Sequence, residues 1–115
     1  MPDSTRAAPG DAPAVRNLGG MLHVQEGAIV SRVLLKNAGG TVTLFAFDDG
    51  QGLSEHTTPY DALVVAVEGR AEIDVAGATH AVAAGETIVL PAGQPHAVRA
   101  VGPFKMVLTM LRAPA

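Results

Sequence analysis

Apolar and polar positions alternate along this chain in short runs, and turn residues separate the runs at close intervals. The turns run from Gly19-Gly20 to Val101-Gly102-Pro103, and all of them contain glycine. The apolar runs between them are four to eight residues long and rich in Val, Ile, Leu and Thr, which is typical of strands and too short for ordinary helices. We predict strands at roughly 28–36, 41–47, 62–68, 71–76, 79–83, 86–90, 96–101 and 104–111.

Many short strands with no amphipathic helical stripe predict an all-β sandwich or closed barrel. The short loops between the strands favour antiparallel pairing. Two runs, Ala62–Val67 and Ile88–Leu90, are apolar on both faces of the strand. The outer face of an isolated barrel would be polar, so a second sheet or a second subunit should cover these strands. We therefore expect a homodimer.

Length and composition narrow the function classes. The chain of 115 residues is sufficient for one domain, which we place at 15–112 between a flexible tail at 1–14 and a short tail at 113–115. A net charge of −3 without a Lys/Arg cluster argues against nucleic-acid binding. No segment approaches the roughly 18–20 consecutive apolar residues of a membrane span. No cysteine is present, which excludes disulfides and thiol chemistry. We expect a cytoplasmic protein without a secretory signal.

Two histidines are the strongest candidates for chemistry. Gly85–His96 reads as a turn glycine, an apolar strand, a tight Pro-x-Gly turn and a histidine that opens the next strand. A second histidine, His56, sits in a similar place before the strand 62–67. Histidines delivered from two strand starts can meet inside one small barrel and share a ligand or a metal ion. Strand alternation adds Phe45 and Met106 as apolar walls of such a pocket.

The segment around His96 resembles a motif of the cupins, which are small double-stranded β-helix (jelly-roll) barrels. The second cupin motif, G-x5-P-x-G-x2-H-x3-N, is matched by Gly85, Pro91, Gly93 and His96, with Ala100 in place of the final Asn. The resemblance implies an all-β jelly-roll fold of the double-stranded β-helix type. It points to the small single-domain bacterial cupins, a group that includes uncharacterised proteins.

The first cupin motif, G-x5-H-x-H-x3,4-E-x6-G, is matched in part. Gly50, His56 and Gly69 fit it, whereas Thr58 replaces the second histidine and Ala62 the glutamate. In metal-bearing cupins, three histidines and a glutamate hold Mn, Fe, Ni or Zn. Only two of these four ligands are present here, so the resemblance implies at most a weakly bound divalent metal at two imidazoles.

Three side chains near the missing ligands carry oxygen atoms that could complete the site: Tyr60, Asp61 and Glu55. Tyr60 has the strand parity to face the same pocket as His56 and His96. Asp61 and Glu55 should point to the opposite face, unless a bulge at the neighbouring proline shifts the parity. The predicted site is therefore His56 and His96 as candidate metal ligands, with a pocket lined by Phe45, Thr58, Tyr60 and Met106.

The sequence leaves two main hypotheses for the role of the histidines. In one, they hold a metal that binds a small oxygenated substrate, for which the resemblance implies dioxygenase, isomerase, decarboxylase or lyase chemistry without selecting one. In the other, the barrel is a metal-free binding module in which His56, His96 and Thr58 hydrogen-bond a small polar ligand, or the imidazoles simply bond each other, a water molecule or backbone. A metal-free enzyme with one histidine as general base is a further possibility, although the sequence offers no clear aspartate to orient it.

Overall fold

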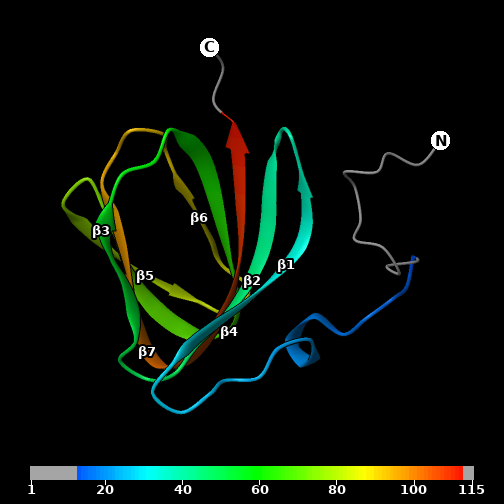
Figure 1. Ribbon diagram of the computed structural model, residues 1–115. Helices are drawn as coiled ribbons and strands as arrows, with labels where there is room; N and C mark the ends of the chain where they lie inside the picture. The colour runs from blue at the N-terminus through cyan, green and yellow to red at the C-terminus, as the bar shows by residue number, and fades with distance from the viewer. Residues whose placement is uncertain (1–12, 113–115) are drawn as a thin grey trace.

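The fold consists of seven β-strands and one short 3-10 helix in a computed structural model that describes residues 13–112 (Figure 1). The helix η1 spans Leu18–Gly20. The strands are β1 (Ile29–Asn37), β2 (Gly40–Phe47), β3 (Gly52–His56), β4 (Tyr60–Val75), β5 (Ala78–Ala83), β6 (Thr87–Leu90) and β7 (His96–Arg112). All strand pairs are antiparallel. The predicted all-β jelly-roll class is thereby confirmed.

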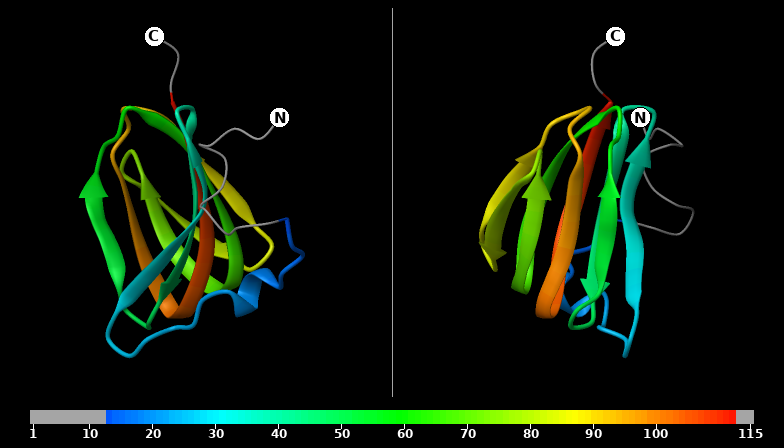
Figure 2. Two further views of the ribbon diagram at one scale, coloured as in Figure 1. Left: turned by 45° about the vertical axis from the view of Figure 1, so that its right-hand side comes forward. Right: turned by 90° about the vertical axis from the view of Figure 1, so that its left-hand side faces the viewer.

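The two longest strands, β4 and β7, take part in both walls of the barrel (Figures 1 and 2). The second half of β7 and the first half of β4 join β1, β2 and β6 in one wall, which we call the β2 sheet. The first half of β7 and the second half of β4 join β3 and β5 in the other, the β3 sheet. Both β4 and β7 bend between the two walls, so each of them begins and ends at the same end of the molecule, which we call the barrel mouth.

The bends explain a difference from the predicted strands. Runs 62–68 and 71–76 form one strand, as do runs 96–101 and 104–111, although glycine separates the members of each pair. Pairing of β4 with β7 continues through the bend, with register shifts on both sides of Glu68. Gly69 has φ +74°, and a Cβ at this position would overlap the carbonyl oxygen of Pro103. A glycine read as a turn from sequence is here a bend that lets two backbones approach closely.

One strand, β3, was not predicted from the sequence. Its residues Gly52–His56 hold only one apolar side chain, Leu53, so no strand-like run stands out. Pairing with β7 forms the strand, and Gly52 permits it because a Cβ there would overlap the carbonyl oxygen of Val98. Tertiary contact, not local preference, therefore creates the strand that carries His56.

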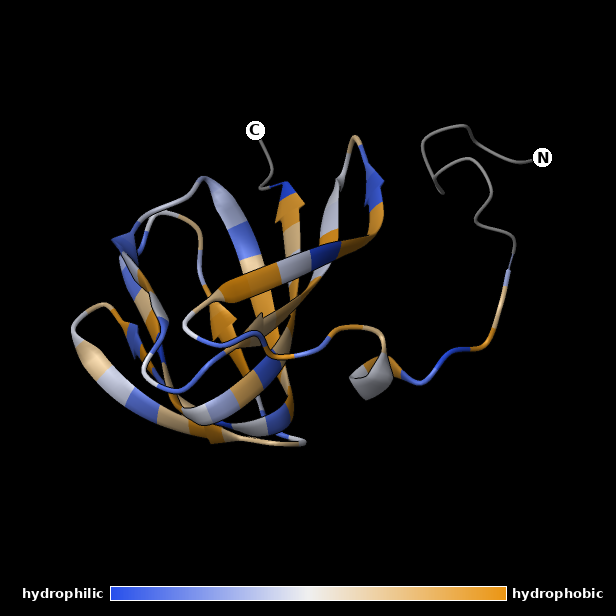
Figure 3. Ribbon diagram, turned by 60° about the horizontal axis from the view of Figure 1, so that its bottom comes forward, coloured by the Kyte–Doolittle hydropathy of each residue, from blue (hydrophilic) through white to orange (hydrophobic). Residues whose placement is uncertain are grey.

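The core fills the space between the two walls, and orange and blue bands alternate along the strands in Figure 3 as expected for walls with one buried face. Phe47 and Phe104 are fully buried, with ring centroids 5.6 Å apart.

A buried lysine attaches the N-terminal segment to the strands. Lys105 donates from Nζ to the carbonyl oxygen of Gly19 at 2.7 Å. No helix within residues 13–112 has the length and apolar character needed to cross a membrane.

Replacing Gly69 with alanine tests the close approach at the bend. We expect Gly69→Ala to lower the free energy of unfolding by at least about 2 kcal/mol, since the new Cβ meets backbone that cannot move aside. The matched control is Gly77→Ala: Gly77 has a similar φ of +85° with no atom near the new Cβ, and should cost about 1 kcal/mol. Urea denaturation measures both, and equal losses would contradict the close-approach argument.

Candidate functional site

The two histidines lie directly opposite each other on neighbouring strands. His56 ends β3, His96 begins β7, and the two residues are register partners. Their ring centroids are 4.4 Å apart and the ring planes meet at 69°, an edge-to-face contact. His96 is buried, whereas His56 is exposed, so the pair spans the boundary between the barrel interior and solvent at the mouth.

A β-bulge turns His56 toward the interior. Leu53 pairs with Val98 and His56 with His96, so three steps along β3 match two along β7. The extra residue reverses the parity, and His56 comes to the same face as Leu53, which packs against the core. The sequence placed His56 at the approach to a strand at 62–67. The structure corrects this: His56 is the last residue of β3, a strand that was not predicted.

Each imidazole bonds through Nδ1 to a backbone carbonyl two residues earlier. His56 Nδ1 lies 2.8 Å from the oxygen of Ser54, and His96 Nδ1 lies 3.3 Å from the oxygen of Gln94. A carbonyl oxygen only accepts, so the neutral rings carry their proton on Nδ1. Within residues 13–112 no protein group bonds to either Nε2 atom, and both lone pairs remain available to a cation or a donor.

Burial and the neighbouring ring both act on His96. Removal from water lowers the pKa of His96 below its ordinary value of 6.5, and repulsion from the His56 ring lowers this pKa further. The hydrogen bond to Gln94 opposes these two effects. His96 is consequently neutral at physiological pH, which is the protonation state a ligand for a metal ion must have.

Thr58 lies in the connection from β3 to β4 and Tyr60 is the first residue of β4, and their polar groups are used differently. The Thr58 hydroxyl lies 3.3 Å from the carbonyl oxygen of Tyr60 and 3.4 Å from its amide nitrogen, so it braces the start of β4. The Thr58 carbonyl accepts from Gly93 at 2.8 Å, which joins the two loops at the mouth. Tyr60 is half-buried, and no hydrogen bond of its hydroxyl forms within residues 13–112.

The two predicted apolar walls lie deeper in the barrel. Phe45 and Met106 are register partners on β2 and β7, on the face that points inward. Met106 is only 1% exposed, so it is packed as core, whereas Phe45 is half-buried. Met110, four residues further along β7, is the methionine that reaches the mouth.

The acidic residues near the missing cupin ligands do not join the histidines in a cluster of possible metal ligands within residues 13–112. Asp61 is exposed and accepts from the Ala92 amide at 2.9 Å, and Glu55 is exposed. Ala62, at the glutamate position of the motif, is buried and has no donor atom. In the part of the chain that the structure describes, no three His, Cys, Asp or Glu side chains gather in a way that would hold a metal ion.

Across the mouth from the histidines, the inner face of the β2 sheet is hollowed. This mouth hollow has a volume of about 290 Å³ and is lined by Lys36, Asn37, Ala38, Gly40, Thr41, Tyr60, Met110 and Arg112. Apart from Tyr60, none of these residues was predicted to line the pocket. The lining residues come from the ends of four strands, which strand pairing brings together. No local sequence motif therefore predicts this hollow.

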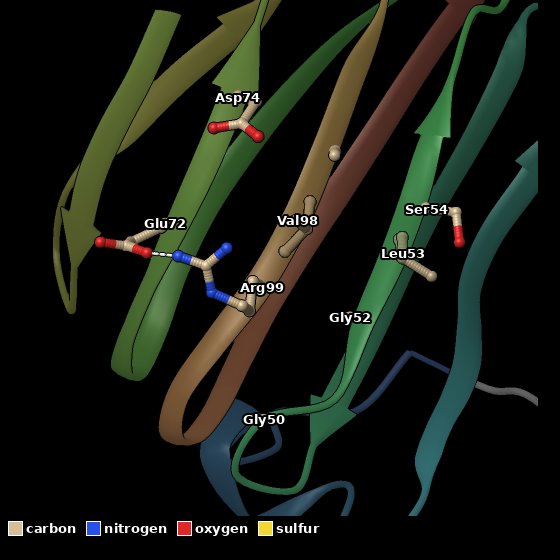
Figure 4. A pocket seen from close by; sticks show the side chains of 9 residues that line it. Gly50, Gly52, Leu53, Ser54, Glu72, Asp74, Val98 and Arg99 are labelled. Carbon is tan, nitrogen blue, oxygen red and sulfur yellow. Dashed lines mark ion pairs between the residues drawn. The ribbon is translucent and has the colours of Figure 1, made fainter.

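A second hollow, of about 310 Å³, lies over the outer face of the β3 sheet (Figure 4). Arg99 and Glu72 are register partners there and form an ion pair between β7 and β4. Asp74 accepts from the Thr79 hydroxyl at 2.6 Å. Arg99 and Glu72 thus neutralise each other, Asp74 is hydrogen-bonded within the sheet, and the hollow lies on the face opposite the histidine pair.

The electrostatic coupling of the two rings is measurable by NMR. We expect the Cε1–H resonance of His96 to titrate with a pKa below 6.5 in the presence of a chelator. In His56→Gln the second positive ring is absent, so the pKa of His96 should rise toward 6.5. His80→Gln, which changes an exposed histidine elsewhere, is the control and should leave it unaltered. An unchanged His96 titration in His56→Gln would show that the rings do not interact.

Comparison with known proteins places this site in a family. The family model for the cupin domain matches residues 43–111, which include both histidines. A search of curated proteins finds no match. Solved structures that resemble the chain include a conserved protein of unknown function from Streptococcus pyogenes, at 36% identity over 91% of this chain and 92% of that one, with a TM-score of 0.85.

Two further structures agree. A cupin superfamily protein from Desulfitobacterium hafniense has 26% identity over 88% of this chain and 94% of its own, with a TM-score of 0.83. A cupin 2 conserved barrel domain protein from Leptotrichia buccalis has 39% identity over 84% of this chain and 47% of its own, with a TM-score of 0.81. The barrel, the motif around His96 and these matches lead to one conclusion: the chain belongs to the cupin family.

Proposed function

We propose that the barrel mouth binds a small molecule, with the histidine pair, His56 and His96, weakly holding a divalent metal ion (Mn, Fe, Ni or Zn) that contacts this ligand. The observation that carries the proposal is the paired geometry: two facing imidazoles whose Nδ1 atoms are both committed to backbone carbonyls. Such carbonyl bonds fix the tautomer that presents Nε2, as in metal sites whose histidines are oriented by a second shell.

The donor set fits a weak metal site better than a tight one. His56 and His96 supply two nitrogen ligands, and the remaining positions would be filled by water or by oxygen atoms of the bound molecule. The Thr58 hydroxyl is occupied at the start of β4 and Asp61 caps the turn at Ala92, so neither completes the set. A divalent cation, when bound, supplies Lewis acidity to an oxygen of the ligand.

The role of this chain's own residues follows from the same geometry. The Gln94 and Ser54 carbonyls orient the two rings, and burial keeps His96 neutral. Val75, the register partner of His96, and Met110 provide apolar surface at the mouth that excludes water from one side of a ligand.

A second candidate is a metal-free binding module, which is favoured because no third protein ligand joins the histidines within residues 13–112. In that case each Nε2 accepts a hydrogen bond directly from a hydroxyl or amide group of the ligand. The two candidates differ in one property: only the first depends on a metal ion. A chelator would abolish ligand-induced thermal stabilisation in the first case and leave it intact in the second.

Metal titration of protein without a histidine tag tests the first candidate. We expect calorimetry to show one site per chain for Ni²⁺ or Zn²⁺, and His56→Gln or His96→Gln to weaken it by more than about tenfold, since each removes one of two protein ligands. His80→Gln is the matched control and should bind as the wild type does. Binding that survives both substitutions, or no uptake of Mn²⁺, Fe²⁺, Ni²⁺ or Zn²⁺ at all, would refute the metal site and leave the metal-free module.

The expected homodimer stays a prediction, and the outer face of the β2 sheet supports it. One row of outward side chains crosses all five strands of this sheet without a charge, in the register order Leu35, Val42, Thr109, Leu63 and Val89. Leu35, Leu63 and Val89 are 44%, 37% and 58% exposed. A second copy would bring the same uncharged row, and a twofold axis would then set apolar side chains against apolar side chains.

Light scattering after gel filtration measures this association. We expect the wild type to elute as a dimer and Leu63→Glu to elute as a monomer, because a charge in the middle of the row would have to be desolvated on association. Ala81→Glu places the same charge on an exposed position of β5 and should remain dimeric. A monomeric wild type would overturn the prediction.

A further inference from the structure

The mouth hollow carries a distinctive set of side chains on one face of the β2 sheet. Lys36 pairs with Thr41, Thr41 pairs with Met110, and Tyr60 pairs with Arg112. Ala62, the other register partner of Met110, is buried in the core, so this face points into the barrel. The hollow and the histidine pair therefore lie on the two opposing walls of the same mouth.

The charge in this hollow is of one sign. Lys36 and Arg112 both line it, and no acidic residue does. Within residues 13–112 only two ion pairs form, Arg99–Glu72 and Lys105–Glu68, so neither cation has a carboxylate partner there. The whole chain has a net charge of −3, which makes this local excess of positive charge unlike the rest of the protein.

The position of Arg112 is fixed while most of its donors remain available. Its Nε donates to the Ala38 carbonyl oxygen at 3.1 Å, and its backbone amide donates to the Gly39 oxygen at 2.9 Å. These two bonds hold the end of β7 against the β1–β2 hairpin. In the described part of the chain the two terminal amino groups of the guanidinium bond to no protein atom. A planar guanidinium in this state is suited to a carboxylate or phosphate oxygen pair.

Uncharged donors complete the lining. The hydroxyls of Tyr60 and Thr41 make no hydrogen bond within residues 13–112. The Asn37 carboxamide oxygen accepts from the Gly39 amide at 2.7 Å, which leaves its NH₂ group to donate outward. Two cations and three neutral donor groups thus surround a space without any negatively charged acceptor.

We propose that the mouth hollow is an oxyanion subsite, which binds the carboxylate or phosphate group of a small organic ligand whose other end reaches His56 and His96. This inference rests on the proposed function and names the chemical class of its ligand. The volume of about 290 Å³ lies at the lower limit of small-molecule sites, so the hollow takes a head group and not an entire ligand. Lys36 and Arg112 provide the charge, while Tyr60 and Thr41 provide orientation.

The test uses the full chain labelled with ¹⁵N and titrated with succinate in one arm and inorganic phosphate in the other, with sodium chloride at matched ionic strength as reference. We expect saturable shifts of the amide resonances of residues 36–41 and 110–112 with succinate, with phosphate or with both. The anion that binds with the lower dissociation constant shows whether the hollow prefers a carboxylate or a phosphate. Lys36→Gln and Arg112→Gln should each weaken binding about fivefold, and the double variant should abolish saturation. Arg70→Gln, at an exposed arginine outside the hollow, should bind as the wild type does.

The outcomes separate this inference from the proposed function. Shifts that do not saturate, that equal those in sodium chloride, or that persist in the double variant overturn the subsite, whatever the histidines bind. The titration is repeated in His96→Gln, where saturation at residues 36–41 should persist because no histidine lines the hollow. A wild type that binds no metal ion but still binds succinate or phosphate at the hollow would refute the metal site alone.

Discussion

The site depends on the continuous pairing of β4 with β7 through a bend. The pairing runs from Tyr60 opposite Arg112 at one end to Val75 opposite His96 at the other. Since both strands fold back on themselves, the two ends of this paired ribbon form opposing walls of one mouth (Figure 2). Gly69 makes the bend possible, as its missing side chain lets the backbone at Pro103 approach. A glycine at the bend, far from the mouth, thus helps to decide where the polar residues at the mouth lie.

The position of the histidine pair depends only in part on local sequence. The motif around His96 predicts that residue, but the direction of the His56 side chain is set by a bulge in β3, a strand that forms because it pairs with β7. The two backbone carbonyls that hold the Nδ1 atoms come from residues two positions earlier in each case. Nearby backbone carbonyls, one from β3 and one from the loop before β7, orient both rings, and no carboxylate within residues 13–112 takes part.

Much of the fold was predictable because strand propensity and hydrophobic alternation are local. The boundaries of the strands around Ala78–Ala83 and Thr87–Leu90 differ by one residue at most from the predicted runs. Glycine was read as a break in β4 and β7, because sequence does not distinguish a turn from a bend with continued pairing. For the site, motif spacing found both histidines. The side chains of Lys36 and Arg112 were missed, since only strand register brings residues 76 positions apart to one hollow.

The β1–β2 hairpin has a particular consequence for the evolution of such barrels. Its tip at 37–39 builds part of the mouth, yet the tip residues are exposed and contribute nothing to the core. Lengthening this tip by insertion would reshape the entrance while the paired strands beneath it remain in place. Selectivity for a new molecule can therefore arise from mutations in the hairpin without a compensating change in the barrel. Ligand recognition and folding can then change independently.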